Sequence, residues 1–147
     1  MELKAQPVQY MGEVRVKVRI TNSADAHAAQ TGKLPLDKVR SVEADALVDT
    51  GAVRPCIPAP LVARLGRLPF ATSLVEYADG RKEAVGLVDG LRFEIMNRPS
   101  SDEALILGDE VLIGQTLLEK MDLMVDRLRH CLVGNLAHPD VAVSKVK

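Results

Sequence analysis

The chain has 147 residues, of which 47% are hydrophobic, so it is long enough for one domain with a sizeable core. Its 19 basic and 20 acidic residues leave a net charge of −1, which argues against a general nucleic-acid binder. Two Tyr, two Phe and no Trp are too few for a nucleic-acid stacking platform, and two cysteines are too few for a disulfide scaffold. The sequence shows no apolar run long enough to cross a bilayer and no signal-peptide pattern, so we expect a cytoplasmic protein that binds no membrane.

The first predicted strand begins at Gly12, where aliphatic and basic residues alternate with a period of two. The next segment, 21–39, has no clear periodicity and is expected to be a long loop, which either shapes a binding groove or is a surface insertion. Extended character returns over residues 42–51. A short helix is predicted from Pro60 to Leu65, because proline suits the first turn and Gly66 the position after the end.

The pattern from Thr72 to Ile95 is again that of strands. Asp79-Gly80 lies between two β-like runs and predicts a hairpin, and a second turn at Asp89-Gly90 leads into a strand. Residues 97–103 are expected to form a loop.

The last part of the chain is apolar and interrupted by glycine. It predicts two short buried strands over 104–114, a helix from Gln115 to Met121, and final strands over 123–126 and 129–133. The tail, 134–147, is expected to be loosely held unless Val141, Ala142 and Val143 pair with another part of the chain. The whole is thus predicted as one mostly β domain over 1–147 with two short helices and a core at about 12–133.

The potential metal ligands are scattered along the chain. His130 and Cys131 are neighbours on a predicted strand, so their side chains point to opposite faces and cannot share a metal ion. Cys56 and Cys131 are expected to be buried, reduced thiols. We therefore predict neither a metal site nor a cofactor.

One motif carries chemistry. Asp49-Thr50-Gly51 ends an apolar strand and is followed by Ala52. Alone it is a weak signal, because all three are ordinary turn residues and an Asx-type turn would explain them. The elements that follow are a short helix, a hairpin with Asp79-Gly80 at its tip, and an apolar segment ending in Gly114 that leads into a helix.

This order resembles the retroviral-type (retropepsin-like) aspartic protease family, and its small bacterial members in particular, over residues 12–133. The resemblance implies a mostly β fold: a single-lobe closed β-barrel or sandwich with one or two short helices, active as a homodimer. It makes Asp49 the catalytic residue. It also implies that Thr50, Gly51 and Ala52 support the active-site loop, with Thr50 bracing the loop of the opposite chain.

Two further elements take their expected roles from the same resemblance. The hairpin would be a flap over the substrate, and the apolar-Gly segment would brace the active-site loop. An ordinary exposed hairpin is the alternative for the flap. The flap residues are Tyr77, Ala78, Asp79 and Gly80, and the brace residues are Leu112, Ile113 and Gly114. Ile57, Val85 and Leu112 are expected to line apolar pockets around a peptide or protein substrate bound as an extended strand.

Peptide hydrolysis by this route needs two carboxylates that share one proton and hold a water between them. The chain has a single D-T-G triplet, so we expect a homodimer in which the Asp49 side chains meet on a two-fold axis. Ala52 cannot donate a hydroxyl hydrogen bond to the pair, which predicts a mildly acidic pH optimum. Arg54 would disturb a shared proton and is expected to point to solvent.

Two other functions stay open. The chain could be a catalytically weak or inactive peptide-binding dimer of the same fold. If the D-T-G triplet is coincidental, it could instead be a monomeric, β-rich structural domain.

Overall fold

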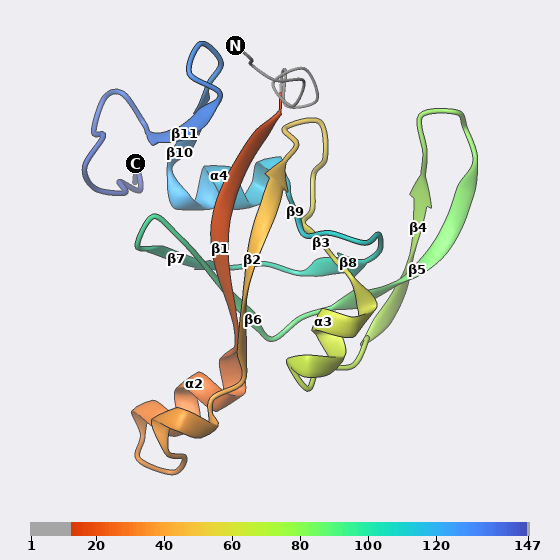
Figure 1. Cartoon of the computed structure of the whole chain (residues 1–147), viewed down its shortest axis with the longest axis vertical. Helices are drawn as coiled ribbons and strands as arrows, with labels where there is room; N and C mark the ends of the chain where they lie inside the picture. Colours follow the sequence, from red (N-terminus) through yellow and green to blue (C-terminus); the bar gives the residue numbers. More distant parts are fainter. Residues whose placement is uncertain (1–12, 147) are drawn as a thin grey trace, which may run out of the picture.

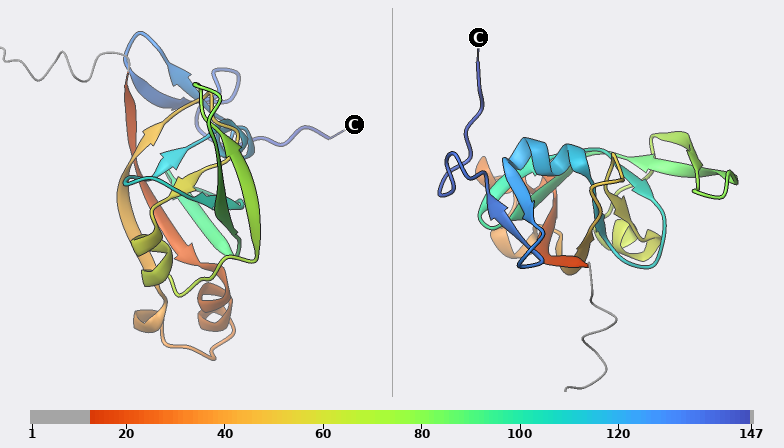
Figure 2. Two further views of the ribbon diagram at one scale, coloured as in Figure 1. Left: turned by 90° about the vertical axis from the view of Figure 1, so that its right-hand side faces the viewer. Right: turned by 90° about the horizontal axis from the view of Figure 1, so that it is seen from above.

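The structure is a computed structural model that describes residues 13–146, which form eleven strands in two sheets (Figure 1). The large sheet is strongly curled and has the order β4-β5-β8-β3-β9-β2-β1-β6-β7, so β4 and β7 are its edges (Figure 2). Its strands are β1 (Val14–Asn22), β2 (Ser41–Val48), β3 (Cys56–Ile57), β4 (Ala71–Glu76), β5 (Lys82–Val88), β6 (Leu91–Ile95), β7 (Arg98–Ser101), β8 (Ala104–Ile106) and β9 (Leu112–Ile113). The second sheet is a hairpin of β10 (Leu123–Asp126) and β11 (Cys131–Gly134). The prediction of a mostly β chain is confirmed.

The alternation predicted for the first strand is present in β1. Val14, Val18 and Ile20 are buried, while Lys17 and Arg19 are exposed. Strand β1 pairs with both β2 and β6 in antiparallel register, so its apolar face meets theirs in one core. Gly12, where we expected the strand to begin, lies outside the described residues.

Helices α3 (Ala59–Arg64) and α4 (Gln115–Met121) lie where the sequence predicted them. Helix α4 buries Leu117, Leu118 and Met121, which pack on the core side of the sheet. Burial of each such side chain contributes about 1.5–3 kcal/mol. None of the described helices is long and apolar enough to span a membrane.

The prediction of a loop over 21–39 is wrong. The segment contains helix α2 (Ser23–Gln30) and a single 3-10 turn, η1 (Leu36–Lys38). Asn22 caps α2 by accepting the N–H of Asp25 at 3.0 Å, the usual role of Asn at this position. Helix α2 has no buried residue, so the apolar periodicity on which the prediction relied is absent.

The loop expected over 97–103 is also wrong, because it contains the edge strand β7, paired with β6. Pro99 fits an edge strand, where no partner needs its missing N–H. Arg98 begins the strand and is buried, with 8% of its surface exposed. A buried arginine needs hydrogen-bond partners, and these lie in the tail and at the end of α4.

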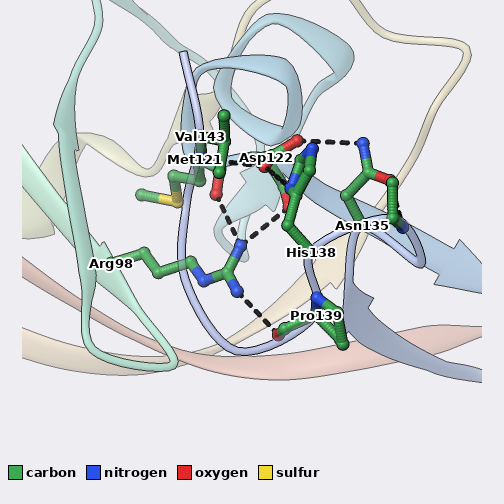
Figure 3. A network of polar contacts seen from close by, with 8 residues as sticks. Arg98, Met121, Asp122, Asn135, His138, Pro139 and Val143 are labelled. Atoms are coloured by element: carbon green, nitrogen blue, oxygen red, sulfur yellow. Dashed lines mark hydrogen bonds and ion pairs between the residues drawn. The ribbon is translucent and has the colours of Figure 1, made fainter.

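The tail is held in place along much of its length, contrary to the prediction (Figure 3). Arg98 donates from Nη1 to the carbonyls of Met121 (3.1 Å) and Asp122 (2.8 Å), and from Nη2 to the carbonyl of Pro139 (2.9 Å). A Cβ on Gly134 would lie 2.1 Å from the Pro139 carbonyl oxygen, so only glycine lets the tail cross here.

Asp122 also holds the tail, and we call the contacts of Arg98 and Asp122 with the tail the tail clasp (Figure 3). Its carboxylate accepts the N–H of Val143 (3.0 Å) and the side-chain amide of Asn135 (3.1 Å), and lies 2.6 Å from His138 Nδ1. These contacts, the Val143 N–H above all, hold the pKa of Asp122 below its usual value despite partial desolvation. The tail is thus tied to the end of α4 as far as Val143.

Candidate active site

Asp49 directly follows β2, and its backbone is fixed by the neighbouring parallel strand β9. The N–H of Asp49 donates to the carbonyl of Ile113 (2.9 Å), and the N–H of Leu47 donates to that of Val111 (2.9 Å). Ile113 is fully buried, so the backbone partner of Asp49 belongs to the core. Leu112 and Ile113 therefore lie beside the loop that carries Asp49.

The loop that carries the motif turns tightly around the Asp49 side chain. Oδ1 of Asp49 accepts the N–H of Gly51 (2.9 Å), and the carbonyl of Asp49 accepts the N–H of Ala52 (3.1 Å). A Cβ on Gly51 would lie only 3.2 Å from that Oδ1. Asp49 and Thr50 are exposed in the single chain, and Ala52 is half-buried, so the carboxylate is open to solvent or to a partner.

Gly114 is the point where the brace meets this loop. It is buried, and a Cβ here would lie 2.7–2.9 Å from the carbonyl oxygens of Ala52, Val53 and Arg54. Such contacts are essentially never seen between a Cβ and a carbonyl oxygen, so the wrapped loop requires glycine at this position.

The first turn of α4 then binds the same carbonyls. The N–H of Gln115 donates to Ala52 (2.7 Å) and the N–H of Thr116 donates to Val53 (3.1 Å). These donors have no partner within the helix, so the loop satisfies them. The sequence analysis did not predict a role for Gln115 or Thr116. The sequence signal that could have indicated it is the start of a helix directly after Gly114.

The Thr116 side chain adds another link that the sequence did not reveal. Its hydroxyl lies 2.8 Å from the Val53 carbonyl and 2.6 Å from Oδ2 of Asp102. Lys120 pairs with the other carboxylate oxygen of Asp102 at 3.4 Å. The segment before β8 is thus tied to α4 and, through it, to the active-site loop.

A cavity of about 680 Å³ lies beside Asp49 and is shared with the β4–β5 hairpin. Tyr77 and Ala78 line it, whereas Asp79 and Gly80, at the tip of the hairpin, do not. Its other lining residues are Gly51, Ala52, Val53, Arg54, Cys56, Ser73, Leu74, Val75, Glu76, Leu105 and Leu107. The cavity therefore joins the motif loop to the expected flap.

The residues proposed for the apolar pockets are not those that line this cavity. Ile57 is fully buried and Val85 is 8% exposed, so both belong to the interior of the fold, and Leu112 does not line the cavity either. The apolar side chains that line the cavity are instead those of Val53, Leu74, Leu105 and Leu107. Sequence alternation alone could not say which strand face would line the cavity.

The β4–β5 hairpin projects from the rest of the molecule (Figure 1). At its tip the N–H of Tyr77 donates to the carbonyl of Arg81, and Gly80 has a φ of 86°, a conformation that favours glycine. The Arg81 guanidinium lies 4.2 Å from the centre of the Tyr77 ring. The Tyr77 hydroxyl donates to Glu83 at 2.5 Å, and this bond raises the pKa of the phenol.

The charges near Asp49 are few. Arg54 is exposed and lines the same cavity, but it forms no ion pair with Asp49 within the described part of the chain. Burial raises the pKa of the Cys56 thiol, and the negative charge of Asp49 raises it further. Cys56 and Cys131 are free and half-buried rather than fully buried.

Residues 13–146 hold no cluster of three or more His, Cys, Asp or Glu side chains placed to bind a metal ion. His130, expected on a strand, lies in the turn before β11 with a φ of 52°. His138 belongs to the tail clasp on Asp122.

Comparison with known proteins finds similarity among solved structures. No protein-family model matches the chain, and no curated protein matches it. Among solved structures, it is similar to the protease of simian foamy virus (mac), with 18% sequence identity and a TM-score of 0.46. The match covers 71% of this chain and 90% of the viral chain.

Proposed function

We propose that the chain is an aspartic endopeptidase that acts as a homodimer, with Asp49 of each protomer forming the catalytic pair. The observation that carries this proposal is the placement of Asp49. Its carboxylate is exposed, on a loop held by β9 and α4, and it borders a cavity of about 680 Å³.

The need for a second copy follows from the chemistry. One carboxylate must take a proton from the attacking water while another, protonated, polarises the scissile carbonyl. No second D-T-G triplet occurs in the sequence, so a second Asp49 has to come from another protomer. The pair then titrates as a unit.

Two features of the cavity favour an extended peptide as substrate. Strand β4 is an edge of the large sheet and contributes Ser73, Leu74 and Val75 to the cavity. An edge strand offers free main-chain groups with which an extended peptide can pair. The side chains of Val53 (65% exposed) and Leu74 (68% exposed) offer apolar surface to a substrate or a partner protomer.

The test combines cleavage with molecular mass. Cleavage of a peptide library is measured between about pH 4 and 7, around the ordinary range of carboxyl pKa values. The wild type is compared with Asp49→Asn and with Asp45→Asn, a matched exposed aspartate on β2. Light scattering gives the mass of each protein.

We expect a dimer whose cleavage is lost in Asp49→Asn and kept in Asp45→Asn. A dimer that binds peptides without cleaving any of them would favour the peptide-binding alternative. A monomer at high concentration would leave Asp49 without its partner and would rule out the proposed mechanism.

A further inference from the structure

A second cavity, of about 510 Å³, lies between α2 and the outer face of β1, β2 and β6. It includes Ser41, at the start of β2, whereas Asp49 follows the end of that strand (Figure 1). An eight-residue strand spans roughly 25 Å, so this cavity is separate from the candidate active site. Its volume lies within the range of small-ligand sites, roughly 300–1,000 Å³.

The floor of the cavity is polar and positively charged. Thr21 pairs in register with Ser41 on one side and with Arg92 on the other, so these three side chains form one row across the sheet. Arg19 lies in the next row and is paired with Glu43 at 2.9 Å. The side chain of Arg92 is exposed and forms neither an ion pair nor a hydrogen bond with any residue of 13–146.

Among residues 13–146, no acidic side chain lines the cavity. The floor thus offers one guanidinium without an anionic partner in the described chain and two hydroxyl groups. A guanidinium presents parallel N–H donors that match the two oxygens of a carboxylate. The charge of the floor therefore favours an anion.

The wall of the cavity is apolar. Helix α2 presents Ala26 and Ala29 to it, and Leu36 and Val39 extend this surface. Leu36 is 83% exposed, so its side chain is accessible to a ligand in the cavity. The wall would accommodate an aliphatic group.

Helix α2 is fixed in position even though it buries none of its residues. Asp25 accepts hydrogen bonds from the side chain of Arg40 at 2.7 and 3.0 Å, and from the backbone N–H of Arg40 at 3.0 Å. The N–H of Ser23 donates to the carbonyl of Gly90. The helix is therefore pinned at its first turn and leaves an open cavity where close packing would be expected.

From this combination we propose that the cavity binds a carboxylate that carries an aliphatic group, with Arg92 pairing with the carboxylate and Leu36 covering the aliphatic part. Such a ligand is either the C-terminal residue of a peptide or a free carboxylic acid. The proposal is independent of any chemistry at Asp49.

The test is a titration of the full-length protein followed by amide NMR signals. The probes are N-acetyl-leucine and N-acetyl-leucinamide, which differ only in the carboxylate. We expect N-acetyl-leucine to shift the signals of Thr21, Ala29 and Gln30 while those of residues 49–52 stay unchanged. The amide should bind about tenfold more weakly or not at all, because it lacks the charge-assisted bond to Arg92.

Variants at exposed positions test the two parts of the site without disturbing the fold. Arg92→Gln should weaken N-acetyl-leucine about tenfold, whereas Arg127→Gln, an exposed arginine in the β10–β11 turn, should not. Leu36→Ser should weaken binding, whereas Leu128→Ser, at a leucine that is 94% exposed, should not.

A last pair of probes separates the two sources of the ligand. Tighter binding of acetyl-Ala-Ala-Leu than of 4-methylpentanoate supports a peptide C-terminus, and the reverse order supports a free acid. Equal binding of N-acetyl-leucine and its amide would overturn the proposal. So would unchanged binding in Arg92→Gln, or an absence of shifts around the cavity.

Discussion

The N–H of Gln115 donates a 2.7 Å hydrogen bond to the carbonyl of Ala52, which joins the first turn of α4 to the loop that carries Asp49. The side chain of Gln115 takes no part in this bond. The geometry of the candidate site therefore depends on backbone contacts. Gly114, which leaves room for those contacts, is more important for this geometry than the side chain of Gln115.

Gly114→Ala should disturb the active-site loop. The added Cβ would meet three carbonyl oxygens at 2.7–2.9 Å, so the loop or α4 must move. We expect a loss of about 1–3 kcal/mol in the free energy of unfolding, measured by chemical denaturation. Gln115→Ala keeps the backbone N–H and should change stability by less than about 0.5 kcal/mol. Equal effects of the two changes would contradict this account of the brace.

The nearness of Cys56 to Asp49 can be measured without any substrate. Asp49 raises the pKa of the Cys56 thiol, so Asp49→Asn should increase the thiolate fraction at pH 8. In a Cys131→Ser background, we expect iodoacetamide to alkylate Cys56 about two- to fivefold faster once the charge is removed. Asp45→Asn is the control and should leave the rate unchanged. An unchanged rate in Asp49→Asn would mean that the two side chains do not interact.

Arg98 should be essential for docking of the tail. Arg98→Ala leaves three carbonyls without their donor, and we expect a loss of about 2–4 kcal/mol in the free energy of unfolding. Arg98→Lys keeps the charge but cannot reproduce the planar fork, so it should restore only part of the loss. Amide exchange of Val143 should quicken in both variants. Full restoration by lysine would show that charge alone holds the tail.

Asp122 should make the free energy of unfolding depend on pH. Its pKa in the folded chain is lowered, so its contribution is fully present above the pKa of the unfolded chain, about 3.9, and is lost as the pH falls through the folded value. Below about pH 4, unfolding should therefore become easier in the wild type, with a weaker dependence in Asp122→Asn. Asp109→Asn, at an exposed position, should keep the wild-type dependence. Urea titrations at several pH values measure this difference.

The parts of the fold that the sequence predicted well have strong local signals. Asp79-Gly80 fixes the hairpin because its turn needs a glycine with positive φ. The helix from Gln115 to Met121 was predicted with its observed bounds, because its buried side chains recur at helical spacing. Asp49 was located from its motif, which lies at the end of an apolar strand.

The parts that were missed depend on contacts between distant residues. Helix α2 buries none of its residues, so the N-cap pair of Asn22 and Asp25 was the main local sign of it. Strand β7 begins with a buried arginine, whose partners lie at Met121, Asp122 and Pro139 and are invisible in a local pattern. The same partners explain why the tail is more ordered than its composition indicates.

Strand β9 and helix α4 hold the loop that carries Asp49, but both are synthesised long after that loop. The Thr116–Val53 contact spans 63 positions, so the Asp49 loop stays unbraced until the ribosome has released residues beyond α4. A contact of such long range also carries the entropy cost of closing a long loop. Nascent or truncated chains that stop before Val111 therefore present the D-T-G triplet on an unfixed loop, because they lack both β9 and α4.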